Sequence, residues 1–437
     1  MEITVVGTGY VGMVAACCLA RSGHTVTAVD KDQEKLEQLR QNVLPIYEKD
    51  LDYIFWEALR DNRLSFTHDL ASSLEQAEIV IVAVGTPAKT DGRIDLSQVY
   101  EVASDLAILA KKPLKVVMKS TVPPGFGQSV CERVFSRSKF KIDYVSNPEF
   151  LREGKAVQDW YFPDRIVIGC NDQEVSKTVA NLYHDLAAPI VFMDVTSAEM
   201  VKYASNAFLA TKISFINEIA NLCERLGTDI DIIAETIGMD KRIGPQFLKA
   251  GLGYGGSCFP KDTRGLDYIS TSYGHCFSLL KAVIEVNSRQ RVLATRKILQ
   301  ALPADNKKVA VLGLAFKPGT NDVREAPALD IIDQLLGEGV EVTACDPIAI
   351  ENAQKKLPSA VVFNQNPYAT CRDCSAVLLA TEWEEYVALD WNQIKGVMKP
   401  PFFLMDGRNA LDPIAIKQAG FRYLGIGRSR NQLVPEY

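Results

Sequence analysis

The stretch Ile3-Thr4-Val5-Val6-Gly7-Thr8-Gly9-Tyr10-Val11-Gly12 decides the fold of this 437-residue chain. Its first residues are typical of a buried strand, its glycines follow the pattern Gly-x-Gly-x-x-Gly, and a helical pattern covers residues 11–22. A second strand-like run, residues 25–29, ends at Asp30, 23 positions after Gly7. A strand, a glycine turn, a helix and a strand that ends in an acid predict the first βαβ unit of a dinucleotide-binding Rossmann fold.

Each residue type in this unit has a physical role in holding a dinucleotide. Gly7 permits the tight turn, Gly9 lets the backbone approach a pyrophosphate, and Gly12 lets the helix pack closely on the sheet. The helix N-terminus then faces the phosphates. A carboxylate at Asp30 would bond the ribose 2′-hydroxyl and repel a 2′-phosphate. We therefore expect NAD rather than NADP, and a glycine turn without a ligand is the less favoured alternative.

Strand-like and helical patterns alternate in the first and last parts of the chain, and a helical part lies between them. The first part has expected strands at residues 3–6, 25–29, 79–84, 116–118, 144–146, 166–168 and 190–192, with helices that include 11–22 and 31–41. The middle part begins with residues 196–225, which contain neither Pro nor Gly, and continues with expected helices at 230–237, 263–271 and 277–302. The last part has expected strands at 309–314, 340–345, 377–380 and 402–405 and a helix at 326–336.

This alternation predicts an α/β fold class, with two Rossmann-like parallel-sheet domains joined by a central helical domain that contains one long helix. The expected domains are residues 1–195, which bind NAD, residues 196–302, and residues 303–437. The two outer parts are weakly alike: Val-Val-Gly-Thr-Gly and Val-Thr-Ala-Val-Asp in the first correspond to Val-Leu-Gly-Leu-Ala and Val-Thr-Ala-Cys-Asp in the last. Each part is therefore expected to be able to bind a nucleotide at the carboxyl ends of its strands.

Composition excludes several classes of protein. Hydrophobic residues make up 47% and charged residues 23%, which is the balance of an ordinary globular protein. The net charge of −6 argues against a general nucleic-acid binder. We see neither a signal peptide nor an apolar run long enough to cross a bilayer, so we expect a cytoplasmic protein without membrane association. Ten scattered cysteines fit a reducing compartment, and Cys371-x-x-Cys374 lacks the second pair that a zinc site needs, so no metal is expected.

Three motifs follow expected strands, at the edge where such sheets bind ligands. They are Gly85-Thr86-Pro87, Ser120-Thr121-Val122-Pro123-Pro124-Gly125 and Asn147-Pro148-Glu149-Phe150-Leu151-Arg152-Glu153-Gly154. Glu149 is a candidate general base, if the fold holds it near a substrate. Ordinary turns and a solvated loop remain open alternatives for all three motifs.

Lys202 and Asn206 stand four positions apart on the long expected helix, so they share one face and can direct donors into a cleft. A solvated stripe is the alternative.

The most specific motif is Gly251-Leu252-Gly253-Tyr254-Gly255-Gly256-Ser257-Cys258-Phe259-Pro260-Lys261-Asp262. Its glycines let the main chain approach a ligand, and Pro260 marks the expected start of the next helix. A helix N-terminus and the nearby Lys261 both lower a thiol pKa, so Cys258 is a candidate nucleophile. A small buried hydrophobe is the alternative for this cysteine.

Together, these motifs resemble the UDP-glucose/GDP-mannose dehydrogenase family over nearly the whole chain. Phe316-Lys317-Pro318-Gly319-Thr320-Asn321-Asp322, with Arg324, adds to the resemblance. It implies oxidation of the C6 alcohol of a nucleotide sugar to a carboxylate with two NAD per sugar. In that scheme Cys258 attacks the aldehyde to give a thiohemiacetal, a thioester forms next, and water hydrolyses it with Glu149 and Asp262 as the base system. Lys202 and Asn206, with a water held by Thr121, would stabilise the oxyanions.

The resemblance also implies binding residues. The substrate positions are Phe150, Leu151, Arg152, Lys202, Asn206, Phe247, Leu248, Lys249, Ala250, Gly251, Gly255 and Lys317, and Arg242 would reach the sugar across a homodimer. The NAD positions are Gly7, Gly9, Tyr10, Val11, Gly12, Asp30, Lys35, Thr86, Thr121, Glu153, Lys261 and Arg324.

The flanks of the cysteine loop favour the UDP-glucose branch over the GDP-mannose branch of this family. A one-step hydroxyacid dehydrogenase, which would lack the nucleophilic cysteine, and a non-catalytic NAD-responsive protein remain alternatives.

Overall fold

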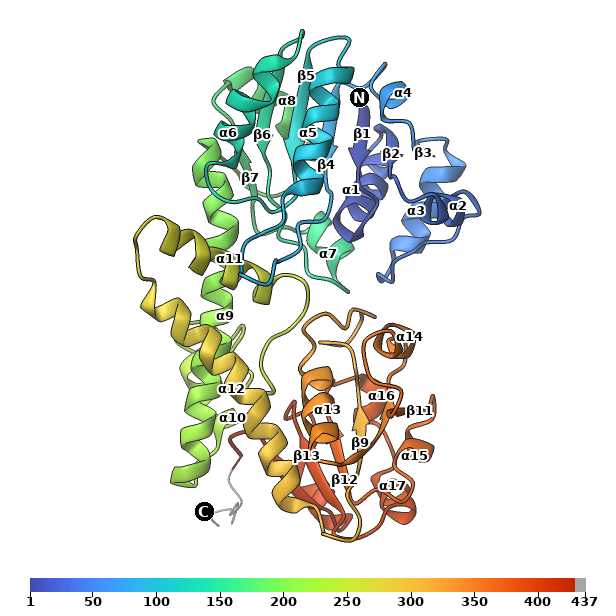
Figure 1. The fold of residues 1–437 in the computed structure, drawn as a ribbon, viewed down its shortest axis with the longest axis vertical. Helices are drawn as coiled ribbons and strands as arrows, with labels where there is room; N and C mark the ends of the chain where they lie inside the picture. The colour runs from blue at the N-terminus through green and yellow to red at the C-terminus, as the bar shows by residue number, and fades with distance from the viewer. Residues whose placement is uncertain (429–437) are drawn as a thin grey trace. The chain divides into compact units, whose positions relative to one another are not determined.

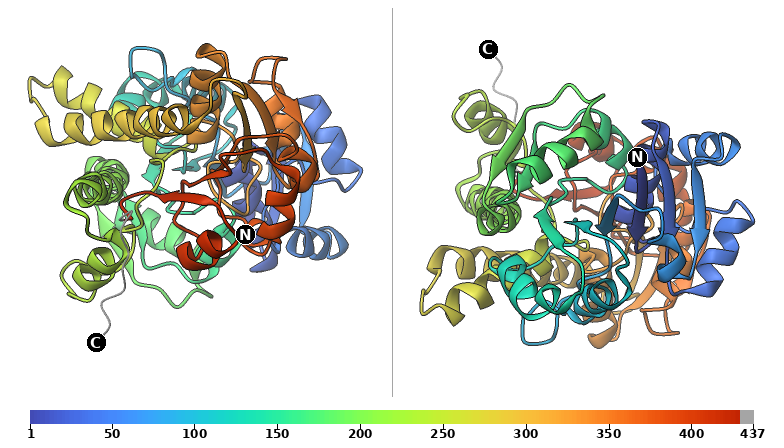
Figure 2. Two further views of the ribbon diagram at one scale, coloured as in Figure 1. Left: turned by 90° about the horizontal axis from the view of Figure 1, so that it is seen from below. Right: turned by 90° about the horizontal axis from the view of Figure 1, so that it is seen from above.

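The structure is a computed structural model that describes residues 1–428. The chain divides into two compact units, Met1–Ser205 and the residues from Asn206 onward. Each unit contains one twisted sheet with helices around it (Figures 1 and 2). The expected fold class is therefore confirmed. The three predicted domain boundaries stay predictions.

The first sheet has eight strands in the order β3-β2-β1-β4-β5-β6-β7-β8. The chain winds outward through β1, β2 and β3 and then returns to β4 beside β1, so the strand order reverses between β1 and β4. In open sheets of this kind, ligands bind at such a reversal. The strands are β1 (Glu2–Val6), β2 (Thr25–Val29), β3 (Leu64–Thr67), β4 (Ile79–Val82), β5 (Leu114–Met118), β6 (Ile142–Ser146), β7 (Ile166–Gly169) and β8 (Ile190–Met193).

One pairing in this sheet departs from the parallel arrangement. Strands β1 to β6 are parallel to their neighbours, but β7 meets β6 in antiparallel fashion through Ser146 and Gly169, and β8 is parallel to β7. A parallel connection needs a crossover element that spans the sheet. The only helix between β6 and β7 is α7 (Ala156–Tyr161), which is about 9 Å long at 1.5 Å per residue and too short for that task.

Helices cover both faces of the first sheet because its strands are apolar on both sides. Ile79 and Ile81 of β4 point into one core, and Val80 and Val82 point into the other. The first core includes residues of α1 (Tyr10–Arg21), α2 (Gln33–Arg40), α3 (Leu51–Arg60), α7 and α8 (Gln173–Ala180), and the second includes residues of α5 (Ser97–Leu109) and α6 (Phe126–Arg133). A short helix, α4 (Leu70–Ser73), follows β3.

The long helix α9 (Val195–Leu226) matches the predicted element. It ends at Gly227, which has a φ of 75° and whose N–H donates to the carbonyl oxygen of Cys223 at 2.9 Å. Glycine tolerates this left-handed conformation, which explains why the helix stops there. Helices α10 (Ile230–Gly238), α11 (Phe259–Ser272) and α12 (Ser278–Ala301) follow, close to their predicted ranges.

The second sheet is parallel throughout, with the order β11-β10-β9-β12-β13-β14. Its strands are β9 (Lys308–Leu312), β10 (Glu341–Cys345), β11 (Val362–Phe363), β12 (Ala376–Leu379), β13 (Phe403–Asp406) and β14 (Arg422–Gly425). The accompanying helices are α13 (Pro327–Gly337), α14 (Ile350–Gln354), α15 (Pro367–Thr370), α16 (Glu384–Val387), α17 (Trp391–Val397) and α18 (Pro413–Gln418). Residues of α9, α10 and α12 share a core with one face of this sheet, which explains why the helices group with it.

The weak internal likeness in the sequence corresponds to a repeated local structure. Gly7 has a φ of 98° and donates its N–H to Val29 O at 2.8 Å, and Gly313 has a φ of 97° and donates to Cys345 O at 2.8 Å. The acid that ends the second strand of each unit then accepts backbone N–H groups from the turn after the first strand: Asp30 from Thr8, and Asp346 from Leu314 and Ala315.

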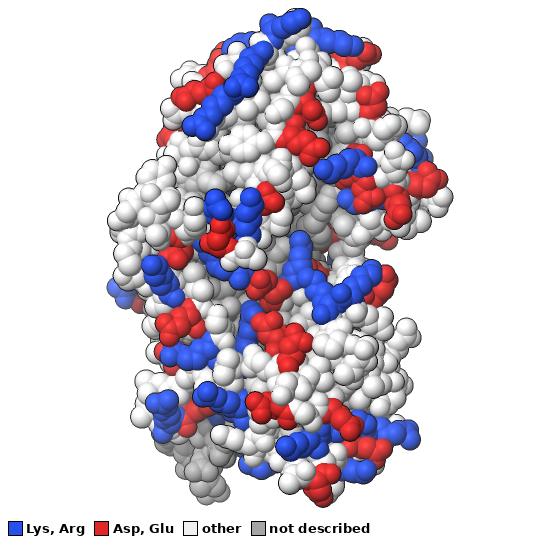
Figure 3. All heavy atoms as spheres, in the orientation of Figure 1, with Lys and Arg blue, Asp and Glu red and all other residues white. Residues whose placement is uncertain are grey.

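Acidic and basic side chains intermix over most of the face drawn in Figure 3. Among the helices of residues 1–428, none combines the length and the apolar character that a membrane span requires.

Candidate active site

The glycine turn after β1 has the shape that a dinucleotide site requires. A Cβ at Gly7 would lie 2.7 Å from Ala83 O, and a Cβ at Gly12 would lie 1.8 Å from Gly7 O, so neither position admits a side chain. Gly9 is different, because a Cβ there would meet nothing within 4 Å. It is also the residue that precedes α1, and Tyr10 and Val11 form the first turn of that helix. Open space at a helix N-terminus beside a tight turn fits a bound pyrophosphate.

Asp30 is held as an anion at the end of β2. Its Oδ2 accepts hydrogen bonds from the Thr8 N–H at 2.8 Å, the Thr8 hydroxyl at 2.6 Å and Lys35 Nζ at 3.1 Å, and its Oδ1 accepts one from Asp32 N at 3.1 Å. Burial alone favours the neutral acid, but these hydrogen bonds and the Lys35 charge lower the pKa of Asp30 to about 2. A carboxylate held in this way can accept a hydrogen bond from a ribose hydroxyl, and its charge repels a phosphate.

Glu149 and Lys202 form a buried ion pair in the first unit. Lys202 Nζ donates to Glu149 Oε1 at 2.8 Å and to Glu149 O at 2.7 Å. Glu149 Oε2 accepts the Leu151 N–H at 2.6 Å, and Lys202 Nζ lies 5.6 Å from the centre of the Phe150 ring. The structure therefore brings four of the predicted site residues together, although 53 positions separate Glu149 from Lys202.

The rest of the 149–154 loop is held by a residue that the sequence analysis missed. Glu48 is buried and accepts the N–H groups of Gly154 at 2.6 Å and Ala156 at 2.8 Å, which caps α7 from outside. Arg152 makes a two-pronged ion pair with Asp159, at 2.9 and 2.6 Å. Thr86, Thr121 and Glu153 are buried or half-buried at their strand ends and in this loop.

A second missed residue, Glu199, holds the loop that contains Thr121. It stands on α9 three positions before Lys202 and accepts the N–H groups of Gly125 at 2.7 Å and Gly127 at 2.8 Å. These groups belong to the start of α6, which has no cap of its own. Burial raises the pKa of Glu199 to about 7 against the opposing effect of the hydrogen bonds.

In the second unit, Cys258 is the residue that precedes α11, with Pro260 at the start of the helix. Its Sγ lies 3.4 Å from the hydroxyl of Ser257. One turn later, Asp262 is almost fully buried and accepts Asn206 Nδ2 at 2.6 Å and Lys261 Nζ at 2.5 Å. Four predicted site residues therefore come from α9, from the residue that precedes α11 and from the first turn of α11.

The glycines before Cys258 are fixed by close approach. A Cβ at Gly255 would lie 2.2 Å from Glu325 O, and Gly256, with a φ of 84°, would bring one within 2.8 Å of the Phe316 ring. This loop therefore packs directly on the segment that carries Lys317 and Arg324. Lys317 Nζ lies 5.3 Å from the Phe316 ring, and Arg324 pairs with Asp322 at 2.8 Å.

The remaining predicted substrate residues lie on the loop after α10. Phe247 adopts a φ of 64°, which is rare for a bulky residue and occurs most often at functional sites. Leu248 and Ala250 are buried and Lys249 is exposed. Arg242 is 89% exposed and pairs with Asp240 at 2.6 Å, so within one chain it is not gathered with the residues around Cys258.

Lys202 and Asn206 stand on one face of the unbroken helix α9, as predicted, and each has a buried carboxylate partner. Lys202 belongs to the first unit, and Asn206 begins the second.

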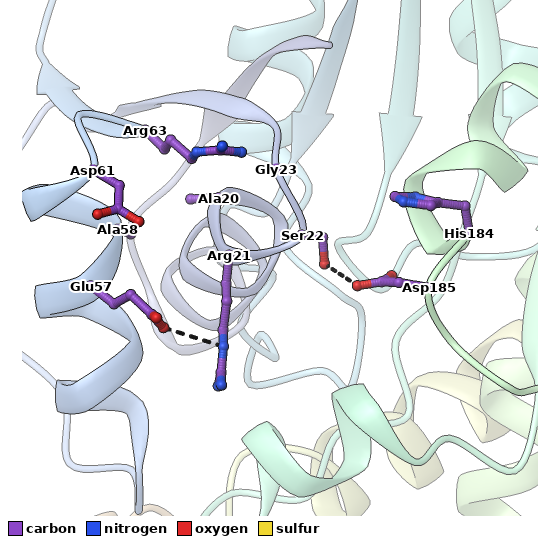
Figure 4. Close-up of a pocket in the computed structure, with 10 residues that line it drawn as sticks. All are labelled: Ala20, Arg21, Ser22, Gly23, Glu57, Ala58, Asp61, Arg63, His184 and Asp185. Carbon is purple, nitrogen blue, oxygen red and sulfur yellow. Dashed lines mark hydrogen bonds and ion pairs between the residues drawn. The ribbon is translucent and has the colours of Figure 1, made fainter.

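A cavity of about 410 Å³ lies at the end of α1 opposite to the glycine turn (Figure 4). Its lining contains Arg21, Arg63 and His184 together with Glu57, Asp61 and Asp185. None of the predicted site residues is among the lining residues, and the charges of both signs do not select one ligand chemistry.

Comparison with known proteins gives the same assignment for all three parts of the chain. Family models of the UDP-glucose/GDP-mannose dehydrogenase family match residues 1–187 (NAD binding domain), 196–289 (central domain) and 310–413 (UDP binding domain).

Individual relatives agree over nearly the full length. A UDP-glucose 6-dehydrogenase of Bacillus subtilis is 44% identical over 98% of this chain and 93% of its own. One from Rickettsia bellii is 43% identical over 98% of this chain and 99% of its own. The solved UDP-glucose dehydrogenase of the hyperthermophilic archaeon Pyrobaculum islandicum superposes with a TM-score of 0.91 at 38% identity, over 97% of each chain. With its glycine turn, its buried ion pair and its cysteine loop, the chain thus belongs to the UDP-glucose/GDP-mannose dehydrogenase family.

Proposed function

We propose that this enzyme oxidises the C6 alcohol of UDP-glucose to the carboxylate of UDP-glucuronate. The observation that carries the proposal is the placement of Cys258 at the start of α11, one turn before the buried pair of Asn206 and Asp262. A nucleophile at this position lets one enzyme take an alcohol past the aldehyde to the acid. The relatives that are 44% and 43% identical over the length of the chain carry the name of this activity.

The residues of the first unit fit NAD. Gly7, Gly9 and Gly12 leave room for its pyrophosphate, and the Asp30 carboxylate suits an unmodified ribose. We also assign Tyr10, Val11, Lys35, Thr86, Thr121, Glu153, Lys261 and Arg324 to NAD binding. When bound, NAD supplies a hydride acceptor for each of the two oxidations.

The chain's own residues carry out the other steps. Cys258 adds as a thiolate to the aldehyde carbon, so a C–S bond forms and the carbonyl oxygen becomes an oxyanion. Lys202 and Asn206, with a water on Thr121, stabilise that charge, and each such donor typically contributes about 3 kcal/mol. When water attacks the later thioester, Glu149 or Asp262 accepts a proton from the water, and the C–S bond breaks to return the thiolate.

Substrate contacts are assigned to two loops. In the first unit, Phe150, Leu151 and Arg152 follow the Glu149 base. In the second, Phe247 to Gly251 and Gly255 line the approach to Cys258, and Lys317 offsets the charge of the diphosphate.

We further propose a homodimer. On α9, Phe208, Phe215 and Leu222 are 67%, 53% and 49% exposed, and their seven-residue spacing places them on one helix face. A row of large apolar side chains on a long helix is suited to a second copy of the same helix. Arg242, exposed on a turn after α10, is then available to the sugar bound by the partner copy.

The domain limits and the location belong to the same proposal. We place the three functional parts at residues 1–195, 196–302 and 303–437. None of the ten cysteines, all of which lie within residues 1–428, forms a disulfide, which suits a cytoplasmic protein because that compartment keeps thiols reduced.

The deciding experiment presents UDP- and GDP-sugars with NAD and counts NADH per sugar. We expect two NADH per UDP-glucose and a UDP-glucuronate product. One NADH per molecule of a hydroxyacid would instead identify a one-step dehydrogenase, and turnover confined to GDP-mannose would move the enzyme to the other branch of the family. No NADH with any substrate would leave a non-catalytic NAD-binding protein.

A further inference from the structure

The loop that leads to Cys258 is buried, yet it has no regular secondary structure. Residues 250–256 are all buried and belong to neither helix nor strand. Backbone N–H and C=O groups in such a segment are shielded from water and need other partners. In this loop, side chains of α9 and α12 supply them.

Two loop residues have both of their backbone groups bound in this way. The Tyr254 N–H donates to Asn287 Oδ1 at 2.7 Å, and Asn287 Nδ2 donates back to Tyr254 O at 3.0 Å. The Gly251 N–H donates to Asn217 Oδ1 at 2.9 Å, and Gln290 Nε2 donates to Gly251 O at 3.0 Å. The side-chain amides of α9 and α12 therefore supply the backbone hydrogen bonds that a neighbouring strand would otherwise provide.

Arg291 extends this support to a second segment. Its Nη2 donates to Tyr254 O at 2.9 Å and to Glu325 O at 3.2 Å, and its Nη1 pairs with Asp330 at the start of α13. The guanidinium thus joins the cysteine loop to the segment that carries Lys317 and Arg324.

The three side chains of α12 form one buried polar stripe. Asn287, Gln290 and Arg291 are at positions i, i+3 and i+4, so they share a helix face. They are buried between Val283 and Ala294, which occupy the same side of the helix. Polar groups at these core positions serve a purpose other than apolar packing, because such groups are retained in a core only when they are paired.

We propose that Asn287, Gln290 and Arg291 are positioning residues that fix the Cys258 sulfur for its attack on the aldehyde. Only three residues separate Tyr254 from Cys258, and one of them, Gly256, is tied by its N–H to Arg324 O at 2.8 Å. A shift of Tyr254 is therefore passed to the sulfur over a short, restrained path. The three side chains act through the loop, and the inference rests on the proposed role of Cys258.

The test compares Asn287→Ala with the intact enzyme, using the full chain. Two properties are measured: the rate and pH profile with which iodoacetamide alkylates Cys258 in the absence of nucleotides, and kcat and KM for UDP-glucose and NAD. Mass spectrometry of the tryptic peptide of residues 250–261, which contains no other cysteine, isolates the reaction of Cys258.

We expect a displaced pH midpoint of alkylation and a kcat that is roughly 10- to 100-fold lower, since small misplacements of reacting groups have effects of this size. Because Gly256 of this loop is tied to Arg324, which we assign to NAD, the KM for NAD is expected to rise as well, whereas the alkylation comparison is made without nucleotide.

Thr295→Val is the matched control. Thr295 is buried on the same helix, but its hydroxyl donates to Arg291 O within that helix and does not contact the loop. We expect this variant to lose stability with normal alkylation and a normal kcat.

The proposal is wrong if Asn287→Ala is destabilised like the control but alkylates and turns over as the intact enzyme does. If Asn287→Ala does not fold, Asn287→Asp takes its place, because it keeps the acceptor for Tyr254 N–H but replaces the donor with a carboxylate oxygen that repels Tyr254 O. An unchanged alkylation profile in that variant also overturns the proposal.

Failure of the proposed function is recognised separately. In that case the intact enzyme does not form two NADH per UDP-glucose, whereas the alkylation comparison requires no substrate and still reports on the loop.

Discussion

In the proposed mechanism the chemistry depends on the sulfur of Cys258, because an oxygen in its place is a weaker nucleophile and a poorer leaving group. We expect Cys258→Ser to lower kcat by several orders of magnitude, since the loss of a covalent nucleophile can lower kcat on the order of a million-fold. NADH per sugar falls below two, or an ester to Ser accumulates and is seen by intact mass. Cys276→Ser, at an exposed thiol of the same unit, is the control. Production of NADH by Cys258→Ser at the normal rate would rule out the nucleophile.

We propose that the Asp30 carboxylate sets the choice between NAD and NADP. Asp30→Ala removes a charge-assisted bond to the ribose together with the repulsion of a 2′-phosphate, so the NAD-to-NADP ratio of kcat/KM is expected to fall about tenfold or more. Asp32→Ala is a close control, because Asp32 accepts Lys35 N at the start of α2 and thereby caps that helix. It is expected to reduce stability by about 1 kcal/mol without altering selectivity. An unchanged ratio in Asp30→Ala means that the 2′-hydroxyl is read elsewhere.

Glu199 makes stability depend on pH. Its pKa is raised to about 7, whereas an unfolded glutamate titrates near about 4.3. The folded state then holds the proton more tightly, so this stabilisation is full below the unfolded pKa and is lost as pH rises through 7. The Tm of the intact protein minus that of Glu199→Gln should fall by several degrees between pH 5 and 8. Glu218→Gln, at an exposed ion pair on α9, should show no such slope, and a flat difference for Glu199→Gln would contradict the assignment.

At the scale of elements, α7 is a short helix whose start is capped by Glu48, about 100 residues away in sequence. Glu48→Ala leaves the N–H groups of Gly154 and Ala156 without their acceptor, and such a loss typically costs about 0.5–2 kcal/mol. Because the same loop carries Glu149 and Glu153, we also expect a higher KM for NAD and a lower kcat. Asp52→Ala, in the first turn of α3, controls for the loss of an exposed acid. A lower Tm with unchanged kcat and KM would show that Glu48 has only a structural role.

The sequence predicts the long elements and misses the short ones for physical reasons. Helix α9 is evident because none of its 32 residues is Pro or Gly and Gly227 follows directly after them. Strand β3 was missed because only one of its four residues is buried, so it has no apolar run. The direction of β7 was not predictable, because its four residues are all buried and an apolar run is the same read from either end.

The residues of the candidate site also differ in how far the sequence predicts them. Cys258, Asp30 and Glu149 stand in motifs whose chemistry is local in sequence. The side chains that hold the loops of Thr121 and Cys258 do not have such a local signal, because Glu199 and Gly125 are 74 positions apart, and Asn287 and Tyr254 are 33 apart. Only the three polar positions on the apolar face of α12 gave a sequence signal that could have been used.

For the whole molecule, the exposed apolar row on α9 determines the expected assembly. We expect a dimer of the 48.3 kDa chain by light scattering, and Phe215→Glu, which places a charge in the middle of that row, is expected to yield monomers. Phe162→Glu changes an even more exposed phenylalanine in the first unit and should leave the dimer intact. Monomers of the intact protein at micromolar concentration would refute the dimer, and equal dissociation by both variants would refute this face as the interface.

The second unit repeats the glycine turn of the first, but the residues that follow the turn are different. Asp346 is 2% exposed, and its oxygens are occupied by the N–H groups of Leu314, Ala315, Ile348 and Ala349. The positions of Gly9 and Gly12 are taken there by Ala315 and Pro318, and α13 begins only at Pro327. If NAD binds only at the glycine turn of the first unit, as proposed, the two oxidations require NADH to leave and a second NAD to bind between them. Under the proposed mechanism the aldehyde stays joined to Cys258 during this exchange, so the lifetime of the C–S bond relative to the departure time of NADH governs whether free aldehyde is released.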